Sequence, residues 1–205
     1  MKTINDFCKQ IIFSGNLEDK ITPPPEGLID EPCGSLTLPE KPERSPRISF
    51  SDEKTKIPRL EHLNLPENRA ISLHHFANHE LLAIELFALA ILKFQDIEKN
   101  IRNSLYKSLL DEQKHFILYL DRLHEFGMDF GERPLNYVFW KQAPKIQTIE
   151  KFAAIVGITF EGANLDYATL YKSIFLHFGD EKCAGIMDEI YNDEIMHVKR
   201  GLYVI

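Results

Sequence analysis

The sequence predicts an all-α protein, with a four-helix bundle over residues 68–205 and a Pro-rich extension over residues 1–67. From Asn68 onward apolar residues recur with the helical period, and no alternating strand pattern of useful length interrupts it. Before that point, nine prolines between Pro23 and Pro66 leave no room for a long helix or a central strand. Apolar residues scattered among these prolines indicate that the extension wraps the bundle.

Composition limits the classes of function. The chain is 44% hydrophobic and 27% charged, and its net charge of −7 provides no global positive field for nucleic acid or an anionic membrane. Its three widely spaced cysteines, Cys8, Cys33 and Cys183, argue against a disulfide framework and fit a reducing compartment. The start is a poor signal peptide, and the most apolar run, 81–92, is too short to span a bilayer. We expect a cytoplasmic protein with no membrane partner and no general nucleic-acid binding.

Five helices are expected. A short one covers residues 3–13, and the four long ones run over about 69–94, 98–126, 148–178 and from 180 to the chain end. Gly127 is placed to end the second long helix as a C-cap, and Thr148 and Asp180 are placed as N-caps of the third and fourth. The connection of roughly twenty residues between the second and third helices predicts a long crossover, as in ferritin-like bundles.

Two of the long helices carry a glutamate and a histidine one turn apart on their apolar faces. In the second helix Glu112 fills a gap in the apolar stripe, and His115 lies one turn further on the same side. Glu194 and His197 repeat this arrangement in the fourth helix. A lone carboxylate in such a stripe is costly to desolvate unless it is paired, protonated or bound to a metal.

The other two long helices each supply one inward acid, Glu80 in the first and Glu161 in the third. Glu80 precedes Glu112 by 32 residues and Glu161 precedes Glu194 by 33, so the chain holds two copies of one helix pair. Two such pairs can pack about a pseudo-twofold axis with six side chains converging. On the third helix, the inward face should hold Ala154, Ile158, Glu161, Leu165 and Ala168.

Glu85 is the alternative to Glu80 as the acid of the first helix. It precedes Glu112 by only 27 residues, which breaks the match between the two halves, so we favour Glu80. His79 is adjacent to Glu80 but points roughly 100° away from it around the helix. We therefore expect His79 at the surface or beside the site rather than among the ligands.

Two glutamates and two Glu-x-x-His pairs are the ligand set of di-iron and di-manganese carboxylate sites in helix bundles. Carboxylates can bridge two hard cations, and imidazole suits iron. We expect Glu112 and Glu194 to bridge two metal ions, with Glu80 and His115 completing one site and Glu161 and His197 the other. The alternative is that these groups satisfy one another as buried polar pairs, although six of them at one level would be costly.

An aspartate precedes each Glu-x-x-His, namely Asp111 and Asp193. A metal-bound imidazole normally donates its other N–H to a carboxylate or carbonyl. Because each aspartate is turned about 100° toward a neighbouring helix, we expect crossed pairs, Asp111 with His197 and Asp193 with His115. The alternative is that both aspartates are solvated surface acids.

The segments HHFANHELLAIEL, LLDEQKHF, TFEGANLDYAT and NDEIMHV resemble a bacterial ferritin-like family called domain of unknown function 455. The resemblance spans nearly the whole chain, the Pro-rich lead-in included. The resemblance implies the ferritin-like fold and an iron site, but it does not indicate which reaction this chain catalyses or on which substrate. Members of that family usually continue past the fourth helix, whereas this chain stops eight residues after His197, which implies a short last helix or an incomplete chain.

Three functions compete on this basis. The first is an O₂- or peroxide-dependent oxidoreductase or hydroxylase on two iron (or manganese) ions. The second is ferroxidation and iron handling, and the third is a non-catalytic bundle with a structural metal. Iron-storage shells assemble from bundles with few additional segments, and the extension of this chain would hinder that packing. We therefore favour an enzyme that is a monomer or a dimer. The sequence identifies neither the substrate, small or macromolecular, nor the catalytic residues.

Overall fold

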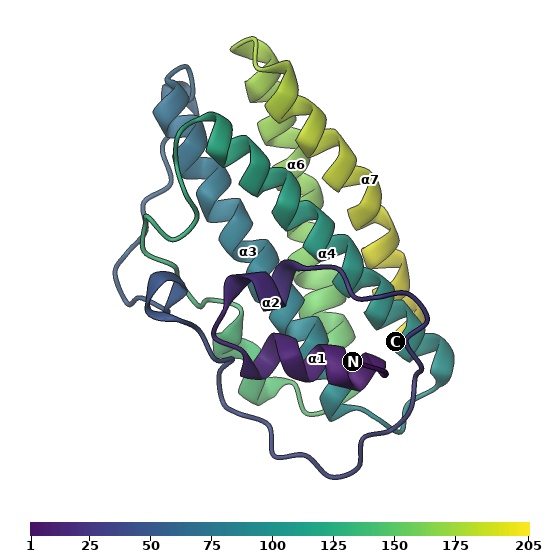
Figure 1. The fold of residues 1–205 in the computed structure, drawn as a ribbon. Helices are drawn as coiled ribbons and strands as arrows, with labels where there is room; N and C mark the ends of the chain where they lie inside the picture. The colour runs from purple at the N-terminus through teal and green to yellow at the C-terminus, as the bar shows by residue number, and fades with distance from the viewer.

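The computed structural model describes residues 1–205, and it confirms the all-α fold without strands. Two antiparallel helix hairpins lie side by side in Figure 1, one of α3 and α4 and one of α6 and α7. The four long helices are α3 (Pro66–Lys93), α4 (Lys99–Glu125), α6 (Glu161–His177) and α7 (Glu181–Val204). The crossover between the hairpins runs along one side of the bundle and contains the 3₁₀ helix η3 (Trp140–Lys145).

The three predicted caps are present, one at the end of a helix and two at the start of a helix. Gly127 has φ +73°, a left-handed conformation that glycine adopts without strain, and it terminates α4. The hydroxyl of Thr148 accepts a hydrogen bond from Lys151 N at 3.3 Å. The carboxylate of Asp180 accepts one from Cys183 N at 3.0 Å, at the start of α7. These bonds satisfy backbone donors that have no partner within the first helical turn.

The third long helix is not α-helical throughout. It begins as α5 (Ile149–Phe152), continues as the π-helical segment η4 (Ala153–Phe160) and becomes α6 at Glu161. A π-helix bonds residue i to residue i+5, so its turns hold more residues than α-helical turns. The predicted inward face is therefore wrong upstream of Glu161. Ala153 and Val156 are buried, whereas Ala154 is exposed and Ile158 is half-buried.

The π-helical segment lies very close to α7 at a pair of glycines. A Cβ atom on Gly201 would lie 2.9 Å from the carbonyl oxygen of Gly157. Real Cβ atoms do not approach backbone atoms so closely, so any side chain at Gly201 would push the two helices apart. The contact lies one helical turn from both Glu161 and His197 in the sequence, and it positions the segments that carry them.

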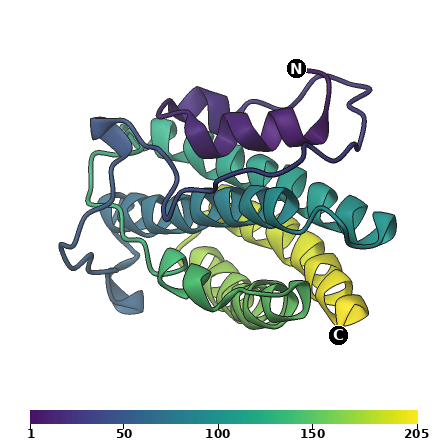
Figure 2. The same ribbon diagram turned by 90° about the horizontal axis from the view of Figure 1, so that it is seen from below.

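The N-terminal extension packs across α3 and α4 as part of one hydrophobic core. Figures 1 and 2 both show α1 (Ile4–Phe13) and α2 (Leu17–Ile21) lying against these two helices. The predicted helix over residues 3–13 is thus present, and α2 was not predicted. Phe7, Ile11 and Ile12 are at most 1% exposed and belong to the same core cluster as the bundle helices. Two 3₁₀ turns complete the extension, η1 (Pro46–Ile48) and η2 (Leu60–His62).

A buried ion cluster also ties the extension to α3. Glu85 accepts hydrogen bonds from Arg44 Nε and Nη2 at 3.0 and 2.8 Å, and Lys20 Nζ lies 3.2 Å from the same carboxylate. The indole N–H of Trp140, from the crossover, donates to it at 3.3 Å. The side chains of Lys20 and Glu85 are both fully buried. Each charge thus depends on the others for compensation.

Helix α3 is the one helix long and apolar enough to cross a membrane by length and composition. However, 89% of its most apolar stretch is buried inside the fold. Its apolar character is therefore explained by its place as the core helix, which is covered by α4, by the extension and by the crossover.

Candidate metal centre

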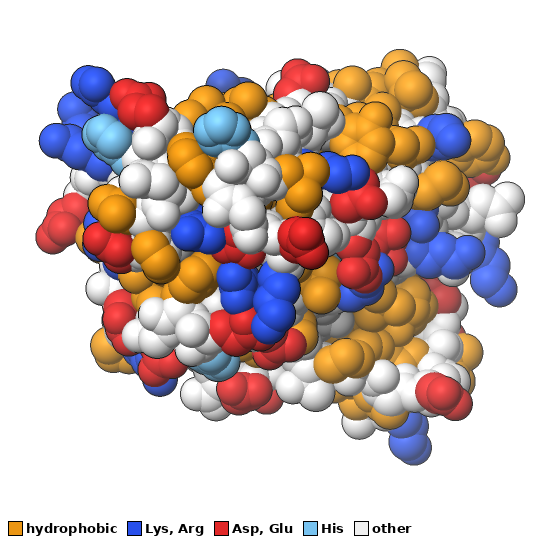
Figure 3. Space-filling model, turned by 90° about the horizontal axis from the view of Figure 1, so that it is seen from above, with side chains coloured by type: hydrophobic (Ala, Val, Ile, Leu, Met, Phe, Trp, Pro, Cys, Tyr) orange, Lys and Arg blue, Asp and Glu red, His pale blue; other side chains and the backbone are white.

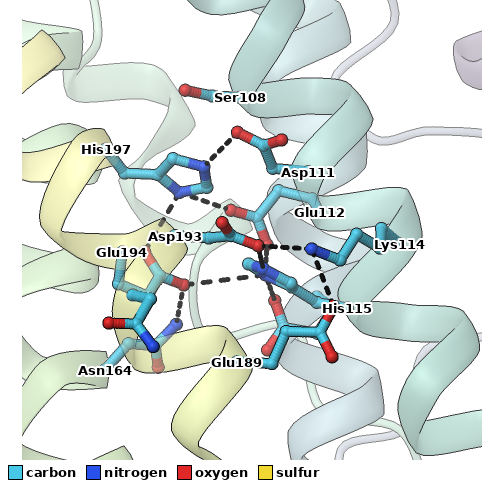
Figure 4. A network of polar contacts seen from close by, with 12 residues as sticks. Ser108, Asp111, Glu112, Lys114, His115, Asn164, Glu189, Asp193, Glu194 and His197 are labelled. Atoms are coloured by element: carbon cyan, nitrogen blue, oxygen red, sulfur yellow. Dashed lines mark hydrogen bonds and ion pairs between the residues drawn. The ribbon is translucent and has the colours of Figure 1, made fainter. Parts of the chain in front are cut away.

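The six acids and imidazoles predicted as ligands lie together in the middle of the bundle. They come from all four long helices, with Glu80 on α3, Glu112 and His115 on α4, Glu161 at the start of α6, and Glu194 and His197 on α7. Each of these residues is at most 2% exposed. Figure 4 shows the α4 and α7 members facing one another across the core.

Their ligand atoms form two overlapping groups of four. Glu80, Glu112, His115 and Glu194 make the first group, and Glu112, Glu161, Glu194 and His197 make the second. Within each group the candidate atoms all lie within 4.8 Å of one another, close enough to surround one ion. Glu112 and Glu194 belong to both groups. The arrangement thus has the form of two adjacent sites that share two carboxylates.

Both imidazoles point the same nitrogen toward the carboxylates. His197 Nδ1 lies 3.1 Å from Glu112 Oε1 and 3.0 Å from Glu194 Oε2. His115 Nδ1 is further from its neighbours, 3.8 Å from Glu112 Oε2 and 3.9 Å from Glu80 Oε2. Nδ1 of each ring is therefore the atom available to a metal ion, and Nε2 is left for another partner.

Buried polar atoms without a hydrogen-bond partner concentrate at this cluster. Ten such side-chain atoms occur in the protein, and seven belong to the six cluster residues. Both oxygens of Glu112 are among them, as are the Nδ1 atoms of both histidines, since the short contacts of His197 Nδ1 with the two carboxylates lack hydrogen-bond geometry. A buried polar atom without a partner costs free energy comparable to a lost hydrogen bond. So many at one place indicate that the side chains are arranged for a ligand rather than for one another.

The charge of the cluster suits two divalent cations. Its four glutamates carry −4 when ionised, and two divalent ions would bring that sum to zero. Burial, and then the neighbouring Glu112, raises the pKa of Glu80 well above its usual value. Burial, and then Glu194, does the same for Glu161. The cluster therefore favours positive charge strongly, and protons compete with metal ions for it.

One family model matches this chain, over residues 11–204, and its description reads "Protein of unknown function (DUF455)". The chain belongs to this family. No curated protein and no solved structure gave a match. Because the description of the DUF455 family names no activity, the function of this member has to be inferred from its own residues.

The predicted crossed pairs between aspartates and histidines are present in this DUF455 chain. Asp111 Oδ2 lies 3.1 Å from His197 Nε2, and Asp193 Oδ2 lies 3.2 Å from His115 Nε2. Each pair joins α4 to α7, as Figure 4 shows. Neither carboxylate is free in solvent, since their side chains are 30% and 29% exposed. The pairs hold each ring with Nδ1 toward the cluster, as metal-binding histidines are usually held.

Each of these aspartates is matched by a cation from the surface side. Arg200 Nη1 donates to Asp111 at 2.8 Å, and Lys114 Nζ donates to Asp193 at 2.7 Å. Each aspartate therefore has both an imidazole and a cation as partners. Burial raises the pKa of Asp111, but the hydrogen bonds from His197 and Arg200 outweigh this and lower it below its usual value.

Sequence patterns did not identify these cations or Asn164. The amide of Asn164 donates to Glu194 Oε1 at 3.1 Å and holds that carboxylate from α6. The sequence does contain a pattern that predicts the position of Asn164, because Asn164 follows Glu161 by three residues and shares its helix face. Nothing comparable marked Lys114 or Arg200, which differ in type and position between the two halves of the chain.

The structure separates the candidate acids of α3. Glu80 lies in the cluster, whereas Glu85 is engaged by Lys20 and Arg44 away from it. His79, as expected, is not part of either group. Its ring lies beside those of His75 and Phe139, with centroids 4.3 and 4.9 Å away. Removal from water lowers the pKa of His79 to about 3, so the ring is uncharged at neutral pH.

Asp193→Ala is expected to weaken metal binding by roughly 10–100-fold while all six cluster residues stay in place. The reason is that His115 loses the carboxylate that orients its ring and raises its basicity. Equilibrium dialysis against the metal ion measures the effect. Glu189→Ala is the matched control, because Glu189 contacts the same Lys114 at 2.9 Å without touching an imidazole. Equal metal affinity in the two variants would show that the Asp193 contact has no role in binding.

Proposed function

We propose that this chain binds two iron ions, with manganese as the alternative, and uses O₂ or a peroxide to oxidise a substrate in the cytoplasm. The observation that carries the proposal is the pair of overlapping buried groups that share Glu112 and Glu194. Three free cysteines, none of them paired, agree with a reducing compartment.

The donor set supports iron over zinc or a closed structural metal. It consists of four carboxylates and two imidazoles with no thiolate, which suits iron and manganese. Iron bound there would supply the redox chemistry of O₂ or peroxide activation. With O₂ a hydroxylation also needs an external reductant, which a peroxide reaction does not.

The protein's own residues have defined tasks in such a reaction. Asp111 and Asp193 orient the two imidazoles, and Asn164 holds the carboxylate of Glu194. Buried rings, among them Phe87 beside His197 at a centroid distance of 6.2 Å, exclude bulk water from the cluster. Water exclusion limits side reactions of oxidising species.

An approach to the cluster favours an enzyme over a structural metal. A small pocket of about 10 Å³, roughly the room for one water molecule, is lined by Glu80, Tyr119, Asn164 and His79. Catalytic metal sites keep a coordination position for water or substrate, while structural ones are closed by protein ligands, and this pocket would admit a water molecule beside Glu80. The pocket is lined by residues of all four long helices and reaches the cluster at Glu80.

Anaerobic loading with Fe(II), followed by exposure to O₂, tests this function. We expect two iron ions per chain by elemental analysis and rapid O₂ uptake that stops when the bound iron is oxidised. Continued uptake and mineral formation with excess Fe(II), in a particle with the mass of a large shell, would favour iron handling instead. Two bound ions that react neither with O₂ nor with added hydrogen peroxide would leave only the structural role, and a folded protein without metal would refute the proposal.

A further inference from the structure

A larger cleft lies outside the small pocket at the metal centre. It has a volume of about 560 Å³, within the range of small-molecule sites. Its walls are the loop 51–56 of the extension, residues 136–138 and Lys141 of the crossover, and His75 and His79 of α3. His79 lines both spaces, since it also borders the small pocket that contains Glu80. A molecule in the cleft would therefore lie against a residue that also borders the pocket.

The rim of the cleft collects cations that have no partner. They are Lys54, Lys56 and Lys141 in the cleft itself, Arg133 in the adjoining pocket that shares Lys56 and His75, and Lys41 beside Tyr137. None of the five forms an ion pair, whereas Arg44, Arg47 and Arg59 of the same extension are all paired. Two acids, Asp52 and Glu53, stand among them.

This excess of positive charge is unusual for the molecule. The chain carries −7 overall, and on the face shown in Figure 3 basic and acidic side chains lie next to one another. At the cleft, by contrast, the hydroxyl of Tyr137 donates to Asp52 at 2.7 Å, and none of the lysines forms an ion pair with that carboxylate. Lys41 and Lys141 lie over the same Tyr137 ring, with their Nζ atoms 4.3 and 4.7 Å from its centroid. An excess of one sign of charge around a cleft concentrates ligands of the other sign.

A buried polar atom in the adjoining pocket also lacks a partner. The Oδ1 atom of Asn78, a residue only 1% exposed, accepts no hydrogen bond, while its amide group donates to Asn136 O at 3.1 Å. Asn78 lines this pocket together with Lys56 and Arg133. A ligand with a hydrogen-bond donor near its anionic group would satisfy this oxygen.

We propose that this cleft binds the substrate and that the substrate is a small molecule with a phosphate or carboxylate group. The anionic group lies among Lys54, Lys56, Arg133 and Lys141, and the body of the molecule extends along Tyr137 toward His79. The inference rests on the proposed function, because only an oxidising centre beyond His79 makes the bound molecule a substrate.

Binding of phenylphosphonate to the full chain as purified tests the cleft. Benzoate distinguishes a carboxylate from a phosphate preference, and the neutral benzyl alcohol controls for contact with the ring alone. We expect the phosphonate or benzoate to bind and the alcohol not to bind. In the double variant Lys56→Gln/Lys141→Gln, affinity should fall roughly tenfold or more, since two charge-assisted hydrogen bonds are lost.

The double variant Lys99→Gln/Lys107→Gln is the matched control. Both lysines are exposed residues of α4 outside the cleft, and their replacement removes the same charge. Equal losses in the two double variants, or equal binding of the alcohol and the anions, would overturn the proposal. Either result would show general attraction or general ring contact in place of a built site.

Proximity to the metal centre is tested separately with ³¹P NMR of phenylphosphonate. In protein loaded with paramagnetic Mn²⁺ the signal should broaden strongly relative to protein loaded with Zn²⁺. Bound Mn²⁺ without such broadening would place the anion away from the centre and overturn its role as substrate site. If the chain takes up no metal, the proposed function fails, while phosphonate binding and its dependence on Lys56 and Lys141 are still measured on their own.

Discussion

Glu112→Gln is expected to remove both metal ions, lowering the metal content of the folded protein from two ions per chain to nearly none. Glu112 belongs to both groups of candidate ligands, and neither of its oxygens has a hydrogen-bond partner in the protein. An amide of the same shape has one oxygen acceptor and no charge, so it can neither bridge two cations nor neutralise them. Elemental analysis after iron-replete growth measures the result.

Glu80→Gln provides the matched comparison. Glu80 is as deeply buried as Glu112 but belongs to one group only, so this variant should keep the ion beside Glu161 and His197. The difference between the two variants tests the shared role of Glu112 rather than the burial of an acid. Retention of one ion in Glu112→Gln, or loss of both in Glu80→Gln, would contradict the two-site arrangement.

Glu85→Ala is expected to lower the free energy of unfolding by about 3–5 kcal/mol, the usual cost of removing one partner from a buried ion pair. Lys20 and Arg44 would remain buried without their counter-charge, and the indole N–H of Trp140 would lose its acceptor. Denaturant titration measures the change. The folded fraction should still bind two metal ions, because Glu85 lies outside both groups.

Two further variants identify the cause of that loss. Glu61→Ala removes an exposed acid that pairs with Arg59 at 3.8 Å, and it should change stability little. Replacing Lys20, Arg44 and Glu85 together by apolar residues of similar volume should recover part of the stability, since no charge is then left uncompensated. Wild-type stability of Glu85→Ala would show that the cluster contributes nothing to holding the extension.

The long helices and the metal cluster could be predicted because both depend on local periodicity. Glu112 and Glu194 interrupt apolar stripes, and the repeat of their spacing from Glu80 and Glu161 relates segments far apart in the chain. The crossed contacts of the two aspartates followed from the same repeat together with the geometry of a helix. The contacts of Asp111 with His197 and of Asp193 with His115 were therefore predictable from the sequence.

Features that depend on tertiary packing could not be predicted in this way. The partners of Glu85 come from 65 and 41 residues earlier in the chain, and no periodic pattern connects them. The cleft likewise joins the extension, α3 and the crossover. The π-helical segment could not be predicted because its sequence, AAIVGITF, is apolar on all sides. Without polar residues to mark one face, the period of a π-helix cannot be told from that of an α-helix.

The π-helical segment also affects how relatives of this chain should be compared. A relative in which the same stretch is entirely α-helical would need one residue fewer between its N-cap and the acid equivalent to Glu161. An alignment without a gap would then pair Glu161 with a neighbour of the true ligand, and the site would look incomplete. Alignments of this family should therefore be anchored on Glu161 and the Gly157–Gly201 contact, with any gap placed inside residues 153–160.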